Sequence, residues 1–172
     1  MEMQIEDIQK AVVVGAGIMG SQIAESLARV GHYPVTLVDR TDELARKGYS
    51  DIEDRLDRYF IAKGTLTIQE KEAILARIKW CSDMGEALKD VDIIIEAVVE
   101  RLDLKKEVFH ILDQLAAEHT LLASNTSLQN ISEMASATQR PEKVVGMHFF
   151  NPVARMKLVE VVRGAKTADH TV

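Results

Sequence analysis

The stretch from Lys10 to Asp39 constrains the fold more than any other part of this sequence. It opens with a short apolar run, Ala11 to Val14, which predicts a buried strand. Three glycines in the spacing G-x-G-x-x-G follow, then a helical pattern, then a second apolar run that ends at Asp39. A strand, a glycine-rich turn, a helix and a strand in this order indicate a βαβ unit that binds a dinucleotide.

Each glycine of this motif has a physical task in such a unit. Gly15 permits the tight turn out of the strand, Gly17 lets a pyrophosphate approach the backbone, and Gly20 lets the helix pack closely on the sheet. Ile18 and Met19 lie between them, where free N–H groups and the helix dipole attract phosphate. We expect these five residues to bind the cofactor.

Asp39 lies nineteen residues beyond Gly20, where a carboxylate can accept hydrogen bonds from both hydroxyls of a ribose. A phosphate on the 2′ oxygen would be crowded and repelled there, which favours NAD over NADP, although Arg40 offers a neighbouring cation. The alternative is that the glycines merely serve a tight turn. The complete strand–helix–strand unit favours dinucleotide binding.

Composition excludes several classes of function. The chain has 172 residues, 47% of them hydrophobic, and a net charge of −6, which suits one α/β domain and argues against nucleic-acid or anionic-membrane binding. Residues 1–10 lack the apolar segment of a secretory signal, so we expect a cytoplasmic chain, or an organelle-matrix chain after removal of a presequence. Cys81 is the only cysteine and is interpreted as a small buried hydrophobe. We predict no metal site.

Strand and helix patterns alternate through the rest of the chain. After the N-cap signal at Thr41 we expect a long helix, broken at Gly64, and a second helix over 68–78; these make a helical arm over about 41–79, or an ordinary surface insertion. We expect further strands at 79–82, 91–98, 120–123, 143–150 and 156–162, and helices at 84–89, 102–118 and 131–137. The pattern predicts a Rossmann-type doubly wound, mostly parallel α/β sheet, with a helical-hairpin insertion after the second strand and an antiparallel addition at the C-terminal end.

Polar residues follow several predicted strands, at the ends where open α/β sheets bind ligands. His148 lies in an otherwise apolar strand, where a lone histidine is usually a satisfied core residue. A turn centred at Ala154 would place Glu160 directly opposite His148, with Cβ atoms about 4.5–5.5 Å apart. A carboxylate at that position can hold an imidazole N–H, which makes the histidine a candidate general base.

Three other polar residues at or near these strand ends are less sharply defined. Ser127 follows a buried strand and either orients a substrate oxygen or caps its loop; no G-x-S-x-G elbow surrounds it, which argues against a nucleophile. Lys105 opens a helix face and is either functional or a solvated charge. The role of Glu96, at the end of the most β-branched run, stays open.

Five segments, GAGIMG, IIIEAVVE, ASNTS, HFFNP and MKLVEVV, resemble in order and spacing the 3-hydroxyacyl-CoA dehydrogenase family, which includes the 3-hydroxybutyryl-CoA dehydrogenases. The likeness covers the NAD-binding domain, from Ile8 to Val162. It implies reversible, NAD-dependent oxidation of a 3-hydroxyacyl-CoA to a 3-oxoacyl-CoA, as in fatty-acid β-oxidation.

The resemblance also implies roles for individual residues. His148 matches the catalytic histidine, Glu160 the carboxylate paired with it, and Ser127 the serine that contacts the 3-oxygen of the substrate. Asp39 matches the adenosine-ribose acid. On the nicotinamide-ribose side, the matching residues are Glu100, Lys105 and Asn151. In the arm, Arg55 and Lys63 match more loosely the residues that would bind the phosphates of coenzyme A. Leu128 departs from the family, where many members have a serine.

In this family a helical C-terminal domain follows, which supplies an active-site asparagine, much of the acyl pocket and most of a dimer interface. The helix-start signal at 167–169 lies three residues before the last residue, and we interpret residues 1–172 as the cofactor-binding half of a longer polypeptide. We therefore expect NAD binding with poor turnover from this chain alone, a homodimer for the longer protein, and an apolar patch near the C-terminal strands.

Two rival classes stay open on the residues alone. A dehydrogenase of the 3-hydroxyacid or 6-phosphogluconate type shares the first domain but uses a lysine base, and a histidine stands at position 148 instead. A non-catalytic NAD-binding module derived from the family is the second; loss of His148 or Glu160 would favour it, and both are present.

Overall fold

A single seven-stranded sheet forms the centre of the computed structural model, which describes residues 5–172. The strand order is β3-β2-β1-β4-β5-β6-β7; neighbours from β3 to β6 run parallel, and β7 pairs antiparallel with β6. The strands are β1 (Ala11–Val14), β2 (Val35–Val38), β3 (Ile78–Cys81), β4 (Ile93–Glu96), β5 (Leu121–Ser124), β6 (Val144–Phe149) and β7 (Val159–Arg163). The predicted fold class is confirmed.

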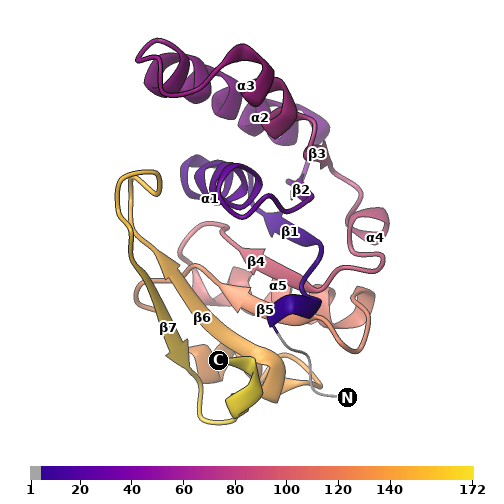
Figure 1. Ribbon diagram of the computed structural model, residues 1–172. Coiled ribbons are helices and arrows are strands. Elements are labelled where there is room, and N and C mark those ends of the chain that lie inside the picture. The colour runs from indigo at the N-terminus through magenta and orange to yellow at the C-terminus, as the bar shows by residue number, and fades with distance from the viewer. Residues whose placement is uncertain (1–4) are drawn as a thin grey trace.

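Helices cover both faces of this sheet (Figure 1). They are α1 (Ile18–Arg29), α2 (Asp42–Leu56), α3 (Ile68–Leu75), α4 (Met84–Ala87), α5 (Leu102–Leu115) and α6 (Ile131–Ala135). Because successive side chains of a strand point to opposite faces, the two faces build two separate cores. Val12 and Val14 contribute to the core that includes residues of α5 and α6, whereas Val13 contributes to the core that includes residues of α1 and α2.

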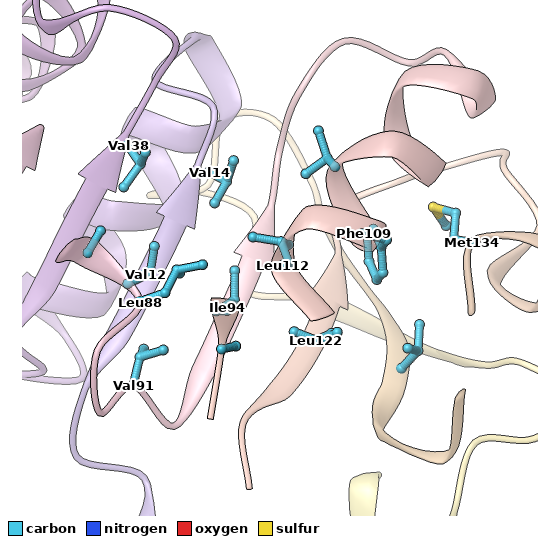
Figure 2. Packing of buried hydrophobic residues seen from close by; sticks show 14 of the residues in the cluster. Val12, Val14, Val38, Leu88, Val91, Ile94, Phe109, Leu112, Leu122 and Met134 are labelled. Carbon is cyan, nitrogen blue, oxygen red and sulfur yellow. The ribbon is translucent and has the colours of Figure 1, made fainter. Parts of the chain in front are cut away.

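Figure 2 shows the first of these cores, in which α5 packs its apolar side against the strands. Phe109 and Leu112 of α5 are fully buried with Ile94 of β4 and Leu122 of β5. Leu115, the last residue of α5, is 46% exposed. The helix ends there, three residues before the end that the sequence predicts.

The predicted helical arm lies between β2 and β3 and is drawn at the top of Figure 1. Thr41 caps α2 by accepting a hydrogen bond from Leu44 N, and Thr67 forms a capping box at the start of α3. The second helix ends at Leu75, so the expected extension to residue 78 is wrong. Ile78 pairs with Val35 in the sheet instead, and that pairing outweighs the helical periodicity.

Two other predicted boundaries also move inward. The strand expected at 91–98 is paired only over β4, and the one expected from residue 156 begins at Val159, which faces the last residue of β6, Phe149. Residues 156–158 lie beyond the end of β6 and have no strand partner there. Ladder pairing rather than apolar character therefore sets these ends.

The expected apolar surface near the C-terminal strands is present. Met156, Leu158, Val161 and Val162 are each between 44% and 54% exposed. The last two belong to β7, which is the edge strand of the sheet. Among residues 5–172, no helix is long and apolar enough to cross a membrane.

Candidate functional site

The glycine-rich turn joins β1 to α1 at the carboxyl end of the central strands. Gly15 has a φ of 101°, and a Cβ there would lie 2.7 Å from the carbonyl oxygen of Ala97. A Cβ on Gly20 would lie 1.7 Å from the carbonyl oxygen of Gly15, whereas the space beside Gly17 is open to at least 4 Å. No side chain caps the start of α1. An open, uncapped helix N-terminus at such a turn fits a pyrophosphate.

Asp39 follows β2 and is held beside this turn. One carboxylate oxygen accepts a hydrogen bond from Ala16 N at 2.7 Å and the other from Arg40 N at 2.7 Å. Each carboxylate oxygen can accept a second hydrogen bond. The two ribose hydroxyls that the sequence analysis assigned to Asp39 therefore have acceptors available.

A pocket of about 310 Å³ opens at the ends of β4, β5 and β6, next to the glycine turn. Five of its lining residues are ones that the sequence predicts to be functional, although they are far apart in the chain: Met19, Glu100, Ser127, His148 and Asn151. Ala97, Val98, Asn125, Phe149 and Phe150 complete the wall. The structure thus brings the predicted cofactor turn and the predicted catalytic side chains into one place.

His148 and Glu160 face each other across β6 and β7, in the register that the sequence predicts. His148 Nδ1 lies 2.8 Å from Glu160 Oε2, and the ring centroids of His148 and Phe150 are 4.5 Å apart. A carboxylate can only accept, so Nδ1 donates its hydrogen to Glu160 and Nε2 is the ring nitrogen left for a ligand. In the neutral form of the imidazole the lone pair therefore lies on Nε2, where it can take a proton.

A buried ionic network lies behind the pocket. Lys105 Nζ, on a side chain 1% exposed, lies 2.7 Å from Glu96 Oε1 and 3.2 Å from Glu100 Oε2. Glu96 is fully buried and also accepts hydrogen bonds from Ser124 Oγ at 2.6 Å and Val98 N at 2.7 Å. The interpretation of Lys105 as a solvated charge is therefore wrong. Its position on the first turn of α5 turns it inward, toward the end of β4.

Glu96 is the site residue that sequence reasoning left without a role. The signal was available, because a carboxylate that ends a wholly apolar strand must find a partner, and Lys105 stands nine residues later on the next helix. Through Lys105 and Val98 N, Glu96 holds the start of the segment that leads to Glu100.

Glu100 reaches the pocket wall from this network and also accepts a hydrogen bond from Thr126 Oγ1. Burial alone would raise the pKa of the Glu100 carboxyl, but the Thr126 hydrogen bond and the charge of Lys105 outweigh it, so the pKa is lowered. Glu100 therefore carries a negative charge at the wall of the pocket at neutral pH.

A second cavity, of about 440 Å³, lies between α1 and the arm. It is lined by four cations, Arg29, Arg55, Lys63 and Arg155, and by one carboxylate, Glu25. Glu25 is buried and pairs with Arg55 at 2.8 Å and Arg29 at 3.5 Å. Both arm residues that the resemblance matches to coenzyme A phosphates thus line one cationic cavity.

Cys81 lies at the end of β3, away from both cavities, and burial raises the pKa of its thiol. A thiol with a raised pKa is a poor nucleophile at neutral pH. The side chain packs against the first core but is only partly buried, less than its interpretation as a buried hydrophobe implies. No group of three or more histidine, cysteine or acidic side chains within residues 5–172 could hold a metal ion.

The fold and the site together define a class, the dinucleotide-binding domain of a dehydrogenase with a histidine–glutamate pair beside its cofactor crevice. Comparison with known proteins leads to the same class. The sequence profile described as "3-hydroxyacyl-CoA dehydrogenase, NAD binding domain" matches residues 10–172. The chain therefore belongs to the 3-hydroxyacyl-CoA dehydrogenase family and represents its NAD-binding domain, as the sequence motifs predict.

Individual relatives give the extent of the match. The chain is 45% identical over 162 residues to a 3-hydroxybutyryl-CoA dehydrogenase of Clostridioides difficile, covering 94% of this chain and 57% of that one. It is 41% identical over 170 residues to the mitochondrial hydroxyacyl-coenzyme A dehydrogenase of Rattus norvegicus, covering 95% and 53%. The crystal structure of (S)-3-hydroxybutyryl-CoA dehydrogenase from Ralstonia eutropha superposes with a TM-score of 0.91 at 43% identity, covering 95% and 57%. The chain thus spans about half the length of these relatives.

Proposed function

We propose that this chain is the cofactor-binding half of an enzyme that reversibly oxidises 3-hydroxyacyl-CoA to 3-oxoacyl-CoA. The observation that carries the proposal is the His148–Glu160 pair, whose histidine lines one pocket together with Ser127 and with Met19 at the start of α1. The names of the relatives support the substrate class.

The chemistry divides between the cofactor and the protein. NAD, when bound, accepts the hydride that leaves C3 of the substrate. Nε2 of His148 takes the proton of the 3-hydroxyl as the C–O bond becomes a carbonyl. Glu160 holds Nδ1–H and stabilises the imidazolium that forms, while the Ser127 hydroxyl orients the substrate oxygen. In the reverse direction His148 returns the proton.

The residues present fit NAD. The open space beside Gly17 and the uncapped start of α1, with Ile18 and Met19, would receive the pyrophosphate. Asp39 would bind the adenosine ribose. On the nicotinamide side, Glu100 and Asn151 line the pocket, and Lys105 lies behind Glu100, 3.2 Å from its carboxylate. We propose that Lys105 acts mainly by holding Glu100.

Coenzyme A would lie along the arm. The cavity between α1 and the arm carries four cations against one carboxylate, in a chain whose net charge is −6. Such a local excess of positive charge attracts phosphate groups. We propose that Arg55 and Lys63 contact the phosphates of coenzyme A, with Glu25 holding the Arg55 guanidinium in place.

The longer protein would add a helical second domain on the exposed apolar surface of β7, and through that domain a homodimer. Residues 1–172, with the arm at about 41–79, would then be the NAD-binding domain alone. Of the two expected locations, cytoplasm and organelle matrix, the name of the rat relative, which places that protein in mitochondria, supports the second.

The test has two measurements. Titration of this chain with NADH, followed by cofactor fluorescence, should give saturable binding. The full-length protein should oxidise NADH when acetoacetyl-CoA is added, and repeating the assay over a series of acyl lengths would define the preferred substrate. Absence of NADH binding would refute the cofactor site. Binding without turnover by the full-length protein would favour the non-catalytic module.

A further inference from the structure

Gln22 lies on α1, two residues beyond the last glycine of the motif, and its side chain takes part in three hydrogen bonds. It lines the cavity beside the arm and is 8% exposed. Its Oε1 accepts from Val153 N at 2.9 Å, and its Nε2 donates to Ile18 O at 3.2 Å and to Asn151 Oδ1 at 3.1 Å. Figure 1 shows the loop between β6 and β7 rising beside α1, where these contacts form.

The partners of Gln22 fix the orientation of its amide. A backbone N–H can only donate and a backbone carbonyl can only accept. Val153 N therefore requires the oxygen of the amide, and Ile18 O requires the nitrogen, so the two ends cannot be exchanged. With Nε2 directed at Asn151, only the oxygen of the Asn151 amide can face it. The NH₂ group of Asn151 must then point away from Gln22, and within residues 5–172 it donates no hydrogen bond to another residue.

We infer that Gln22 is a positioning residue, which turns the amide of Asn151 so that its N–H₂ is offered to the ligand pocket. Asn151 lines the pocket that contains His148 and Ser127. An N–H₂ group at this point selects a ligand with an acceptor oxygen there. That oxygen belongs either to the nicotinamide riboside of the cofactor or to the acyl-CoA substrate. The inference rests on the proposed function for the identity of these two ligands.

The decisive variant is Gln22→Glu, which keeps the length of the side chain but offers only acceptors. Asn151 then turns its N–H₂ toward residue 22 and its oxygen toward the pocket. There the Asn151 oxygen faces the acceptor oxygen of the ligand, with which it can form no hydrogen bond. We expect a roughly tenfold loss of affinity for the ligand that supplies this oxygen. The loss falls on the dissociation constant of NADH if the cofactor supplies the oxygen, and on the KM for acetoacetyl-CoA at saturating NADH if the substrate does. Asn151→Asp, which also presents an oxygen, should lose as much.

If Gln22 served only to stabilise the fold, its replacement would have the same effect on binding with and without the Asn151 amide. In an Asn151→Ala background Gln22→Glu should cause no further loss in either constant. Gln22→Met, which is uncharged, should cause a smaller loss in the same direction and separates orientation from added charge. Gln114→Glu, the same charge change on the exposed side of α5, is the matched control and should match the parent protein. Equal losses with and without the Asn151 amide would overturn the inference.

Neutron diffraction tests the orientation without any ligand, because it distinguishes a deuterated Nδ2 from Oδ1. Deuterons on the Asn151 atom that faces Gln22 would overturn the inference whatever the enzyme does. Failure of the parent chain to bind NADH, with the orientation as described, would instead count against the proposed function alone. The two failures are therefore distinguishable.

Discussion

His148 and Glu160 are direct register partners across the antiparallel strands β6 and β7, and Nδ1 of the imidazole lies 2.8 Å from a glutamate oxygen. The glutamate comes from the edge strand and its side chain is 54% exposed, whereas the His148 side chain is 18% exposed and lines the ligand pocket. The carboxylate therefore contacts Nδ1 only, and Nε2 is left available to a ligand in the pocket.

Replacement of His148 by Gln should abolish most of the turnover of the full-length enzyme. The amide keeps some hydrogen bonding but cannot accept the proton of the 3-hydroxyl, so kcat should fall by roughly 10²–10⁴. The dissociation constant of NADH should change little, because the glycine turn and Asp39 are untouched. Steady-state kinetics and NADH titration measure the two effects. An unchanged kcat would place the base elsewhere.

Replacement of Glu160 by Gln should lower kcat while the protein folds normally. The amide can still accept from Nδ1–H, but it removes the charge that stabilises the imidazolium. Because both residues serve one proton transfer, the double variant with His148→Gln should be hardly slower than the slower single variant. Multiplicative losses in kcat would show that the two residues act independently.

Replacement of Asp39 by Ser should weaken the preference for NADH over NADPH. The carboxylate beside Ala16 N repels a 2′-phosphate, and the neighbouring Arg40 can pair with that phosphate once the carboxylate is gone. Titration of the parent and the variant with both cofactors gives the ratio of dissociation constants. An NADPH affinity equal to that of NADH in the parent would mean that Asp39 does not contact the ribose.

Much of this site follows from sequence because its local signals agree with the global fold. The glycine motif, the capping residue Thr41 and the turn about Ala154 each determine a local geometry, and the sheet register that places His148 against Glu160 follows from that turn. The apolar runs also locate the strands along the chain, although several predicted strands extend beyond the residues that find a ladder partner.

The features that sequence did not predict depend on contacts between distant segments. Helical periodicity around Lys105 does not tell whether a long cation is solvated or turned inward, and its burial is decided by Glu96 and Glu100. Likewise, nothing near Gln22 indicates a contact with Asn151, which is 129 residues away. Polar networks of this kind become visible only when the packed strands and helices are in place.

The lowered pKa of Glu100 gives a pH-dependent contribution to stability. A carboxyl whose pKa is lower in the folded than in the unfolded chain stabilises the fold above the unfolded value of about 4.3, and this stabilisation is lost as pH falls through the folded value. Glu100→Gln should therefore be less stable than the parent at pH 7, and this difference should shrink in acid. Urea unfolding from pH 7 downward measures it.

Glu107→Gln, an exposed position on α5, provides the control for this pH series. It should follow the parent protein closely at each pH. A stability difference for Glu100→Gln that stays constant from neutral to acidic pH would contradict the role given to the Thr126 hydrogen bond and to Lys105.

Removal of the Lys105 cation should be among the most destabilising single changes in the chain. Lys105→Met fills a similar volume but leaves the fully buried Glu96 carboxylate without its cation, at a cost of about 3–5 kcal/mol in the free energy of unfolding. Adding Glu96→Gln should recover much of that loss, because a neutral amide has no charge to bury. Urea unfolding of the single and double variants measures both steps.

Lys106→Met, at the next position of α5, is the control and should cost less than about 1 kcal/mol. If Glu96→Gln gave no recovery in the Lys105→Met background, the loss would come from packing rather than from an uncompensated charge.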